Sequence, residues 1–175
     1  CSKPCSGASA VLLASENVAK KFEQPIWIKG IGQKTTSASL TKNEDLTTMT
    51  STKIAAKQAL DMAKIQVNDV DVTELHDAFT ICEIMALEDI GFVKKGNGAS
   101  YVRELYDTQD NKINPRGGLI GSGHPLGATG VAQVIEIVQQ LQNKAEKRQI
   151  KNANVGLVHN MSAAATSSTV LLFQS

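Results

Sequence analysis

Short apolar runs alternate with longer stretches of helical spacing along this chain. The apolar runs predict five strands, at residues 8–14, 26–32, 69–75, 154–159 and 169–173. Apolar residues repeated every three to four positions predict helices over residues 17–22, 45–64, 80–90 and 129–148. Because strands and helices alternate, we expect an α/β layered fold in which a mixed five-stranded sheet packs against helices.

Glycines mark several of the expected boundaries. Gly30 and Gly32 are expected to break the second strand. Gly91 is expected to end the helix over residues 80–90, with Phe92 packing back on that helix end. Residues 94–113 are polar and hold further glycines, which predicts a loop.

Composition and charge narrow the class of protein. The chain has 175 residues, of which 42% are hydrophobic and 20% charged, so we expect a globular domain rather than disorder. Eighteen basic and 17 acidic residues give a net charge of +1, which argues against a nucleic-acid-binding protein. No long apolar run predicts a membrane span, and no signal peptide is evident.

Three cysteines and the first residues bear on location and completeness. The odd count (Cys1, Cys5 and Cys82) fits a reducing compartment, so we expect a cytoplasmic protein. The chain starts at Cys1 and soon enters an apolar run, so we expect a fragment or one half of a larger protein.

The most specific segment is NPRGGLIGSGHPLGATG, residues 114–130. It places His124 in a glycine-rich turn directly before a predicted helix. Glycines permit close backbone approach, and a helix N-terminus stabilises anions and oxyanions. We therefore expect His124 to belong to an acyl-transfer site; a phosphate-binding or purely structural turn is the alternative.

The two other histidines also lie at the ends of predicted strands. His76 opens the sequence HDAF and is either a site residue or a hydrogen-bonded structural histidine. Asp77 either orients His76 or caps the following helix, and capping is favoured. His159 ends the strand VGLVH. No two histidines share a ligand spacing, so no metal site is predicted.

No residue of the chain stands out as a nucleophile for acyl transfer. Cys82 falls on the helix after HDAF at a position expected to face the core, where a thiol is inert. Cys1 and Cys5 have no evident base beside them. A nucleophile outside this chain would agree with a half-molecule.

Together these motifs resemble the thiolase superfamily, specifically its C-terminal half. NPRGGLIGSGHPLGATG resembles the signature that carries the family's GHP histidine, and HDAF and VGLVHN resemble the branch of sterol-carrier-protein-type and archaeal acetoacetyl-CoA thiolases. CSKPCSGASAVLLASE resembles the last strand of the thiolase N-terminal domain. The resemblance implies that residues 1–24 end the N-terminal domain and that residues 25–175 form the thiolase-like C-terminal domain.

The resemblance also implies roles for the histidines. The nucleophilic cysteine would lie in the N-terminal half, and His124 would help to activate it and would bind the thioester oxygen. His76 would hold a water in the oxyanion hole, and His159 would lie at the position of the second catalytic cysteine, as an acid/base.

Coenzyme A would be a substrate, with no permanently bound cofactor. Its contacts are expected at Ser2, Gly123, Gly127 and Ser162. The resemblance further implies a homo-oligomer, with an N-terminal thiolase half as a partner.

Two departures from the family pattern bear on activity. Ala78 stands where the sterol-carrier branch often has a cysteine. Residues 161–165, MSAAA, replace the expected glycines, and alanine disfavours the positive φ that glycine adopts freely.

The function expected from this resemblance is an acyltransferase that condenses or thiolyses 3-oxoacyl-CoA through an acyl-cysteine. Two alternatives stay open. One is a retro-aldolase for CoA thioesters with an OB-type (zinc-ribbon) partner protein. The other is a non-catalytic lipid- or acyl-CoA-binding subunit. A cysteine at a helix N-terminus in the preceding half would favour the acyltransferase over the retro-aldolase.

Overall fold

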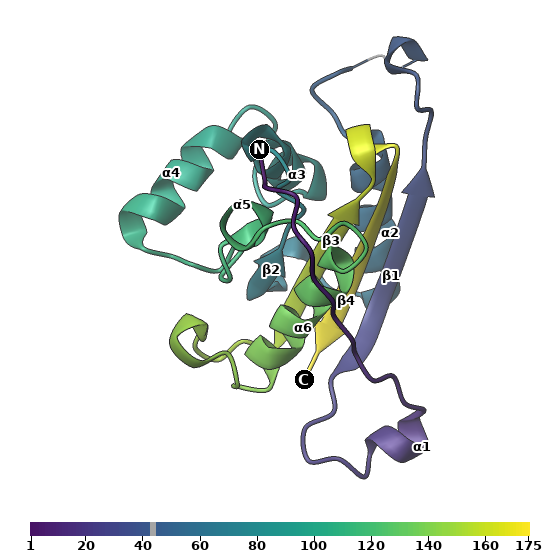
Figure 1. Ribbon diagram of the computed structural model, residues 1–175, viewed down its shortest axis with the longest axis vertical. Coiled ribbons are helices and arrows are strands. Elements are labelled where there is room, and N and C mark those ends of the chain that lie inside the picture. Colours follow the sequence, from purple (N-terminus) through teal and green to yellow (C-terminus); the bar gives the residue numbers. More distant parts are fainter. Residues whose placement is uncertain (43–44) are drawn as a thin grey trace.

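The computed structural model describes residues 1–42 and 45–175, in which one sheet is flanked by helices (Figure 1). The strands are β1 (Trp27–Thr35), β2 (Val72–Glu74), β3 (Val155–Met161) and β4 (Ser167–Gln174). The α-helices are α1 (Glu16–Ala19), α2 (Thr50–Ala63), α3 (Thr80–Ile90), α4 (Gly98–Thr108), α5 (Gly118–Ser122) and α6 (Thr129–Leu141). Short 3-10 turns are η1 (Leu40–Lys42), η2 (Val67–Asp69), η3 (Glu146–Arg148) and η4 (Ala163–Ala165).

The sheet is mixed, as predicted, with the strand order β1-β4-β3-β2. β2 and β3 are parallel, whereas β4 runs antiparallel to both β1 and β3. β3 is an inner strand and is buried along nearly its whole length, which explains its nearly continuous apolar sequence.

Helices cover both faces of the sheet (Figure 1). Leu157 of β3 and Leu172 of β4 belong to the apolar cluster that contains the α2 alanines. Their neighbours Val158 and Phe173 point to the other face, into the cluster with Ile137 of α6. This helix–sheet–helix layering confirms the α/β layered fold.

Glycines on β1 bring that strand against α2. A Cβ on Gly30 or Gly32 would fall on the carbonyl oxygens of Ala59 and Ala55, respectively. Ala55 and Ala59 are fully buried at this contact. The glycines do not end the strand, because β1 continues to Thr35; its pairing with β4 shifts register between Ile28 and Gly30, and the glycines permit close packing.

Of the five predicted strands, the one at residues 8–14 is not formed in the described part of the chain. The segment forms no backbone ladder with β1–β4, and Figure 1 shows it crossing the molecule as an extended trace. Leu12 and Leu13 are 86% and 76% exposed. The sequence pattern identified an apolar run, but the described residues provide neither a paired strand nor a face that covers it.

Three predicted helix and loop boundaries also change. The helix predicted from residue 45 begins at Thr50, because the Asp45 carboxylate accepts hydrogen bonds from Thr47 and Thr48 and forms a turn there. The helix predicted over 129–148 ends at Leu141. Residues 94–113 hold α4 rather than a continuous loop, because Gly98 lets that helix start against the carbonyl of Ile84 on α3.

The helix over residues 80–90 was predicted correctly, and Gly91 ends it with a φ of 103°. In the described parts of the chain, no helix combines the length and apolar character needed to cross a bilayer.

Candidate active site

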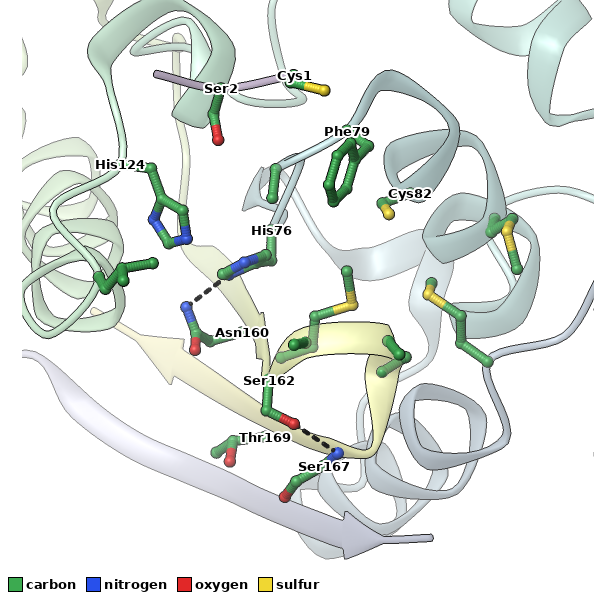
Figure 2. A pocket seen from close by; sticks show the side chains of 18 of the residues that line it. Cys1, Ser2, His76, Phe79, Cys82, His124, Asn160, Ser162, Ser167 and Thr169 are labelled. Atoms are coloured by element: carbon green, nitrogen blue, oxygen red, sulfur yellow. Dashed lines mark hydrogen bonds between the residues drawn. The ribbon is translucent and has the colours of Figure 1, made fainter. Parts of the chain in front are cut away.

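The two segments that carry HDAF and GHP meet the end of β3 around one cavity. His76 follows β2, and Asn160 lies near the end of the neighbouring parallel strand β3. His124 comes from the loop between α5 and α6. These three residues line a cavity of about 830 Å³ (Figure 2). The site thus lies at the carboxyl ends of parallel strands, where α/β sheets commonly bind ligands.

His76 and His124 lie next to each other in the cavity wall. Their ring centroids are 5.0 Å apart and the ring planes meet at 87°. Both side chains contribute to the cavity lining. The two motifs are far apart in the sequence, and the fold brings their histidines together.

The hydrogen-bond partner of the His124 ring is the Thr129 hydroxyl. Nδ1 of His124 lies 2.7 Å from this hydroxyl, which also contacts the Pro125 carbonyl at 3.1 Å. We assign the single hydroxyl proton to that carbonyl, so that Thr129 accepts from Nδ1–H of His124. In this assignment Nε2 of His124 is the acceptor nitrogen that faces the reaction.

The partners of His76 give the opposite assignment. The buried Gln133 donates from Nε2 to the His159 carbonyl, so its Oε1 accepts from Nδ2 of Asn160 at 2.8 Å. The same Nδ2 lies 3.0 Å from Nδ1 of His76 and donates its second proton there (Figure 2). His76 therefore carries its proton on Nε2.

The two rings thus offer complementary nitrogens. Burial, together with the nearby His124, lowers the pKa of His76 from 6.5 to about 4, so its ring is neutral at neutral pH. His124 presents Nε2 as an acceptor, and His76 presents a neutral N–H donor. This pairing suits proton removal beside a developing oxyanion.

The Asp77 carboxylate caps a helix, although not the one that follows it in sequence. Its Oδ1 accepts from the Leu119 N–H at 2.6 Å, which joins HDAF to the start of α5 in the GHP segment. Gly118 has a φ of 59°, and a Cβ there would fall on this carboxylate. Asp77 thus holds the two motifs together, as a cap rather than as a partner of His76.

Asn114, the first residue of the GHP signature, makes a second link between the motifs. Its Oδ1 accepts from the Leu75 N–H at 2.7 Å, and its Nδ2 donates to Glu83 at 2.8 Å. The bond to Leu75 fixes the backbone directly before His76.

His159 does not line the cavity. Its side chain is fully buried and turned toward α2, where Nε2 lies 3.0 Å from the Thr52 hydroxyl. Burial, and then the proximity of His76, lowers the pKa of His159 from 6.5 to about 3. The ring has no exposed face through which to exchange a proton with a substrate, so the geometry gives no support to the expected acid/base role.

The residues expected to contact coenzyme A do not all lie in one hollow. Ser2 and Ser162 line the cavity with the histidines (Figure 2). Gly127 instead lines a second hollow against residues 5–9. Gly123 lines neither of these hollows; it has a φ of 85°, and a Cβ there would fall on Sγ of Cys5.

Cys82 is partly buried and packs against the main apolar core, as expected, and it also lines the cavity. Burial raises the pKa of its thiol, which therefore stays protonated at neutral pH. Methionines 49, 85 and 161 line the cavity with it and give an apolar wall. Among residues 1–42 and 45–175, no three His, Cys, Asp or Glu side chains gather closely enough to hold a metal ion.

The MSAAA segment adopts the backbone conformation that its alanines disfavour. Ala164 and Ala165 have φ values of 56° and 52°, in the left-handed region. The turn also forms part of the cavity wall. The alanines thus reproduce a glycine-like backbone at an energetic cost.

Asn160, Gln133 and Thr129 were not among the predicted site residues. Each has a signal in the sequence: Gln133 interrupts the apolar face of a helix, and Thr129 opens that helix five residues after His124. Asn160 follows His159 and, because side chains alternate along a strand, points to the opposite face.

A family model described as "Thiolase C-terminal domain-like" matches residues 32–175, and the chain belongs to this family. An "Acetyl-CoA acetyltransferase" of Methanothermobacter thermautotrophicus is 39% identical over 176 residues, 99% of this chain and 46% of that protein. "Sterol carrier protein 2" of Homo sapiens is 37% identical over 169 residues, 92% of this chain and 31% of that protein.

A solved structure, the "Ltp2-ChsH2(DUF35) aldolase", has a similar fold, with a TM-score of 0.73 at 19% sequence identity. The similarity covers 85% of this chain and 39% of that one. The chain thus spans about half or less of the length of the relatives named here.

Proposed function

We propose that this chain forms the C-terminal part of a thiolase-type acyltransferase that acts on acyl-CoA thioesters. The observation that carries the proposal is the pair of adjacent histidine rings beside one cavity, in which the N–H of His76 lies next to the His124 ring, whose Nε2 we assign as an acceptor. The names of the archaeal acetyl-CoA acetyltransferase and of sterol carrier protein 2 support it.

In this proposal a thiolase N-terminal half supplies the nucleophilic cysteine. Nε2 of His124 takes the thiol proton, and the thiolate attacks the 3-oxo carbon of a 3-oxoacyl-CoA. The N–H of His76, directly or through a water, stabilises the oxyanion that forms. The C2–C3 bond then breaks, acetyl-CoA leaves after C2 takes up a proton, and free CoA removes the acyl group from the cysteine.

The remaining cavity lining agrees with such a substrate. Methionines 49, 85 and 161 and the alanines of η4 offer an apolar surface for the acyl group. Ser2 and Ser162 offer hydroxyls at its edge for the polar pantetheine arm. Coenzyme A is a substrate in this proposal rather than a resident cofactor.

The test is cleavage of acetoacetyl-CoA, with and without free CoA, by this chain assembled with its thiolase N-terminal half. We expect CoA-dependent cleavage, and a fall of about 100-fold or more in kcat/KM for both His124→Ala and His76→Ala. Tyr106→Ala on α4, an exposed tyrosine outside the cavity lining, serves as the control and should leave the rate unchanged.

Two results would overturn the proposal. Binding of CoA by the folded assembly without turnover would favour a non-catalytic acyl-CoA-binding subunit. Cleavage of a 3-hydroxyacyl-CoA without any need for free CoA would favour a retro-aldolase.

A further inference from the structure

A line of buried hydroxyl groups connects His159 to the wall of the cavity. The Thr52 hydroxyl lies 3.0 Å from His159 Nε2 and 2.9 Å from the Ser168 hydroxyl. Ser168 in turn lies 2.8 Å from the Ser51 hydroxyl, which donates at 2.6 Å to the carbonyl oxygen of Ala165. We call Thr52, Ser168 and Ser51 the hydroxyl relay; with His159, all of these side chains are at most 1% exposed.

The direction of every bond in the relay is fixed by its last acceptor. The Ala165 carbonyl can only accept, so the single proton of Ser51 goes there and Ser51 accepts from Ser168. Ser168 therefore accepts from Thr52, and Thr52 accepts from His159. His159 must carry its proton on Nε2, and its buried Nδ1 has no partner among the described residues.

The backbone of His159 connects to the other wall of the cavity. Its carbonyl accepts from Gln133, which accepts from Asn160, which in turn donates to His76. His159 therefore connects to His76 through its backbone carbonyl, and through its side chain to the left-handed turn that ends at Ala165.

The turn depends on such support because of its backbone conformation. Ala164 and Ala165 both have positive φ, and residues held in this region persist only where surrounding contacts determine them. The Ala165 N–H donates back to the Ser162 carbonyl, whereas the Ala165 carbonyl is held by the relay. The flanks of the turn are held separately, since the Thr36 N–H donates to the Thr166 carbonyl and the Ser162 N–H to the Ser167 carbonyl, so the relay acts on the Ala165 carbonyl at the strained end of the turn.

We propose that His159 is a positioning residue. Its neutral Nε2–H, through Thr52, Ser168 and Ser51, holds the Ala163–Ala165 turn against the site that contains His76. The effect on catalysis rests on the proposed function, whereas the tautomer and the tie to the turn do not.

The activity test uses variants that separate a hydrogen-bond donor from a proton carrier. His159→Gln retains an N–H near the position of Nε2 but has no titratable group. His159→Met has no N–H donor and no titratable group. Thr52→Val removes the relay hydroxyl that contacts His159, and Thr52→Ser keeps a hydroxyl at this position. Thr50→Val, at an exposed position on the same helix, is the matched control.

In thiolysis of acetoacetyl-CoA by the assembled enzyme, we expect kcat to fall about tenfold or more in His159→Met and Thr52→Val, with a smaller change in KM. His159→Gln, Thr52→Ser and Thr50→Val should stay within about threefold of the parent. A rate for His159→Gln as low as that for His159→Met, together with an active Thr52→Val, would identify His159 as an acid/base and overturn the proposal.

Two readouts test the same inference without turnover. Nitrogen chemical shifts of the His159 ring should report the Nε2–H tautomer, and an Nδ1–H tautomer would contradict the relay. Hydrogen exchange of the peptide over residues 162–167 should accelerate in Thr52→Val, while the β3 amides keep their protection. Because Ser51 still donates to the Ala165 carbonyl in this variant, unchanged exchange over 162–167 would show that His159 and Thr52 do not help to hold the turn, which would overturn the proposal.

Discussion

His76 and His124 stand edge to face, with ring centroids 5.0 Å apart, and we assign them different tautomers. For His76 the assignment traces back to the His159 carbonyl, which orients the Gln133 amide. For His124 it places the Thr129 hydroxyl proton on the Pro125 carbonyl. The site is therefore preorganised before any substrate arrives.

The first prediction concerns Thr129, the acceptor for Nδ1–H of His124. In Thr129→Val the ring loses the bond that keeps Nε2 free to accept a proton. We expect kcat/KM for acetoacetyl-CoA thiolysis by the assembled enzyme to fall about tenfold to 100-fold, as losses of partners to catalytic groups commonly do. Isothermal titration with CoA should show little change in affinity.

A second threonine supplies the control for this prediction. The Thr108 hydroxyl donates to the carbonyl four residues earlier, as Thr129 does, but it lies at the exposed end of α4. Thr108→Val should leave kcat/KM unchanged. Equal rates for Thr129→Val and Thr108→Val would contradict the assigned role of Thr129.

The second prediction concerns Glu74, a fully buried carboxyl at the end of β2. Burial, reinforced by Glu136 and opposed in part by Arg116, raises its pKa from 4.5 to about 8. Between these values the unfolded chain releases a proton that the folded chain keeps, so stability falls as pH rises. Glu74→Gln has the same size and cannot ionise, which removes this loss.

Urea denaturation at pH 5 and pH 8 checks this prediction. The free energy of unfolding of the parent should fall across this interval by on the order of 2 kcal/mol more than that of Glu74→Gln. Equal falls in the two proteins would show that Glu74 is ionised at neutral pH in the folded state.

The third prediction compares two glycines within α5. Gly118 has a positive φ, and a methyl group there would fall on the Asp77 carboxylate, whereas a Cβ at Gly121 would meet nothing within 4 Å. We expect Gly118→Ala to lower the free energy of unfolding by about 2 kcal/mol or more. Gly121→Ala should raise it by about 0.5–1 kcal/mol, as alanine does inside a helix.

Thermal denaturation of both variants measures this difference. Gly118→Ala should also reduce thiolase activity, because the Asp77 cap joins the segments that carry His76 and His124. Similar stability of the two variants would show that the contact between Gly118 and Asp77 is not tightly packed.

The sequence predicted the layers of the fold well because the buried strands are apolar and the helices repeat at helical spacing. It failed at residues 8–14, where an apolar pattern exists but the described chain offers no strand to pair with. It also failed at α4, whose contact through Gly98 depends on the position of α3. Local sequence indicates a preferred secondary structure, but tertiary packing determines whether the segment adopts it.

The sequence predicted the site residues that lie in recognisable motifs. It did not predict the residues whose role depends on contacts between distant parts of the chain. His76 and His124 stood out as residues in motifs, and the fold brings them together. His159 was a weaker candidate on sequence alone, and its side chain alternates to the opposite face of β3 from Asn160. A shift of one position along a strand therefore decided which of the two neighbours reaches the cavity.

The last prediction concerns the backbone cost of the MSAAA turn. Ala164 has a φ of 56°, which costs an alanine about 1–2 kcal/mol and costs glycine almost nothing. Glycine in turn loses about 0.5–1 kcal/mol in chain entropy, so Ala164→Gly should be neutral or slightly stabilising. Ala163→Gly, at a neighbour without positive φ, carries only the entropic loss and should destabilise by about 0.5–1 kcal/mol. Urea denaturation of both variants would measure the gap between them, and a more stable Ala163→Gly would mean that the turn does not adopt the left-handed conformation in solution.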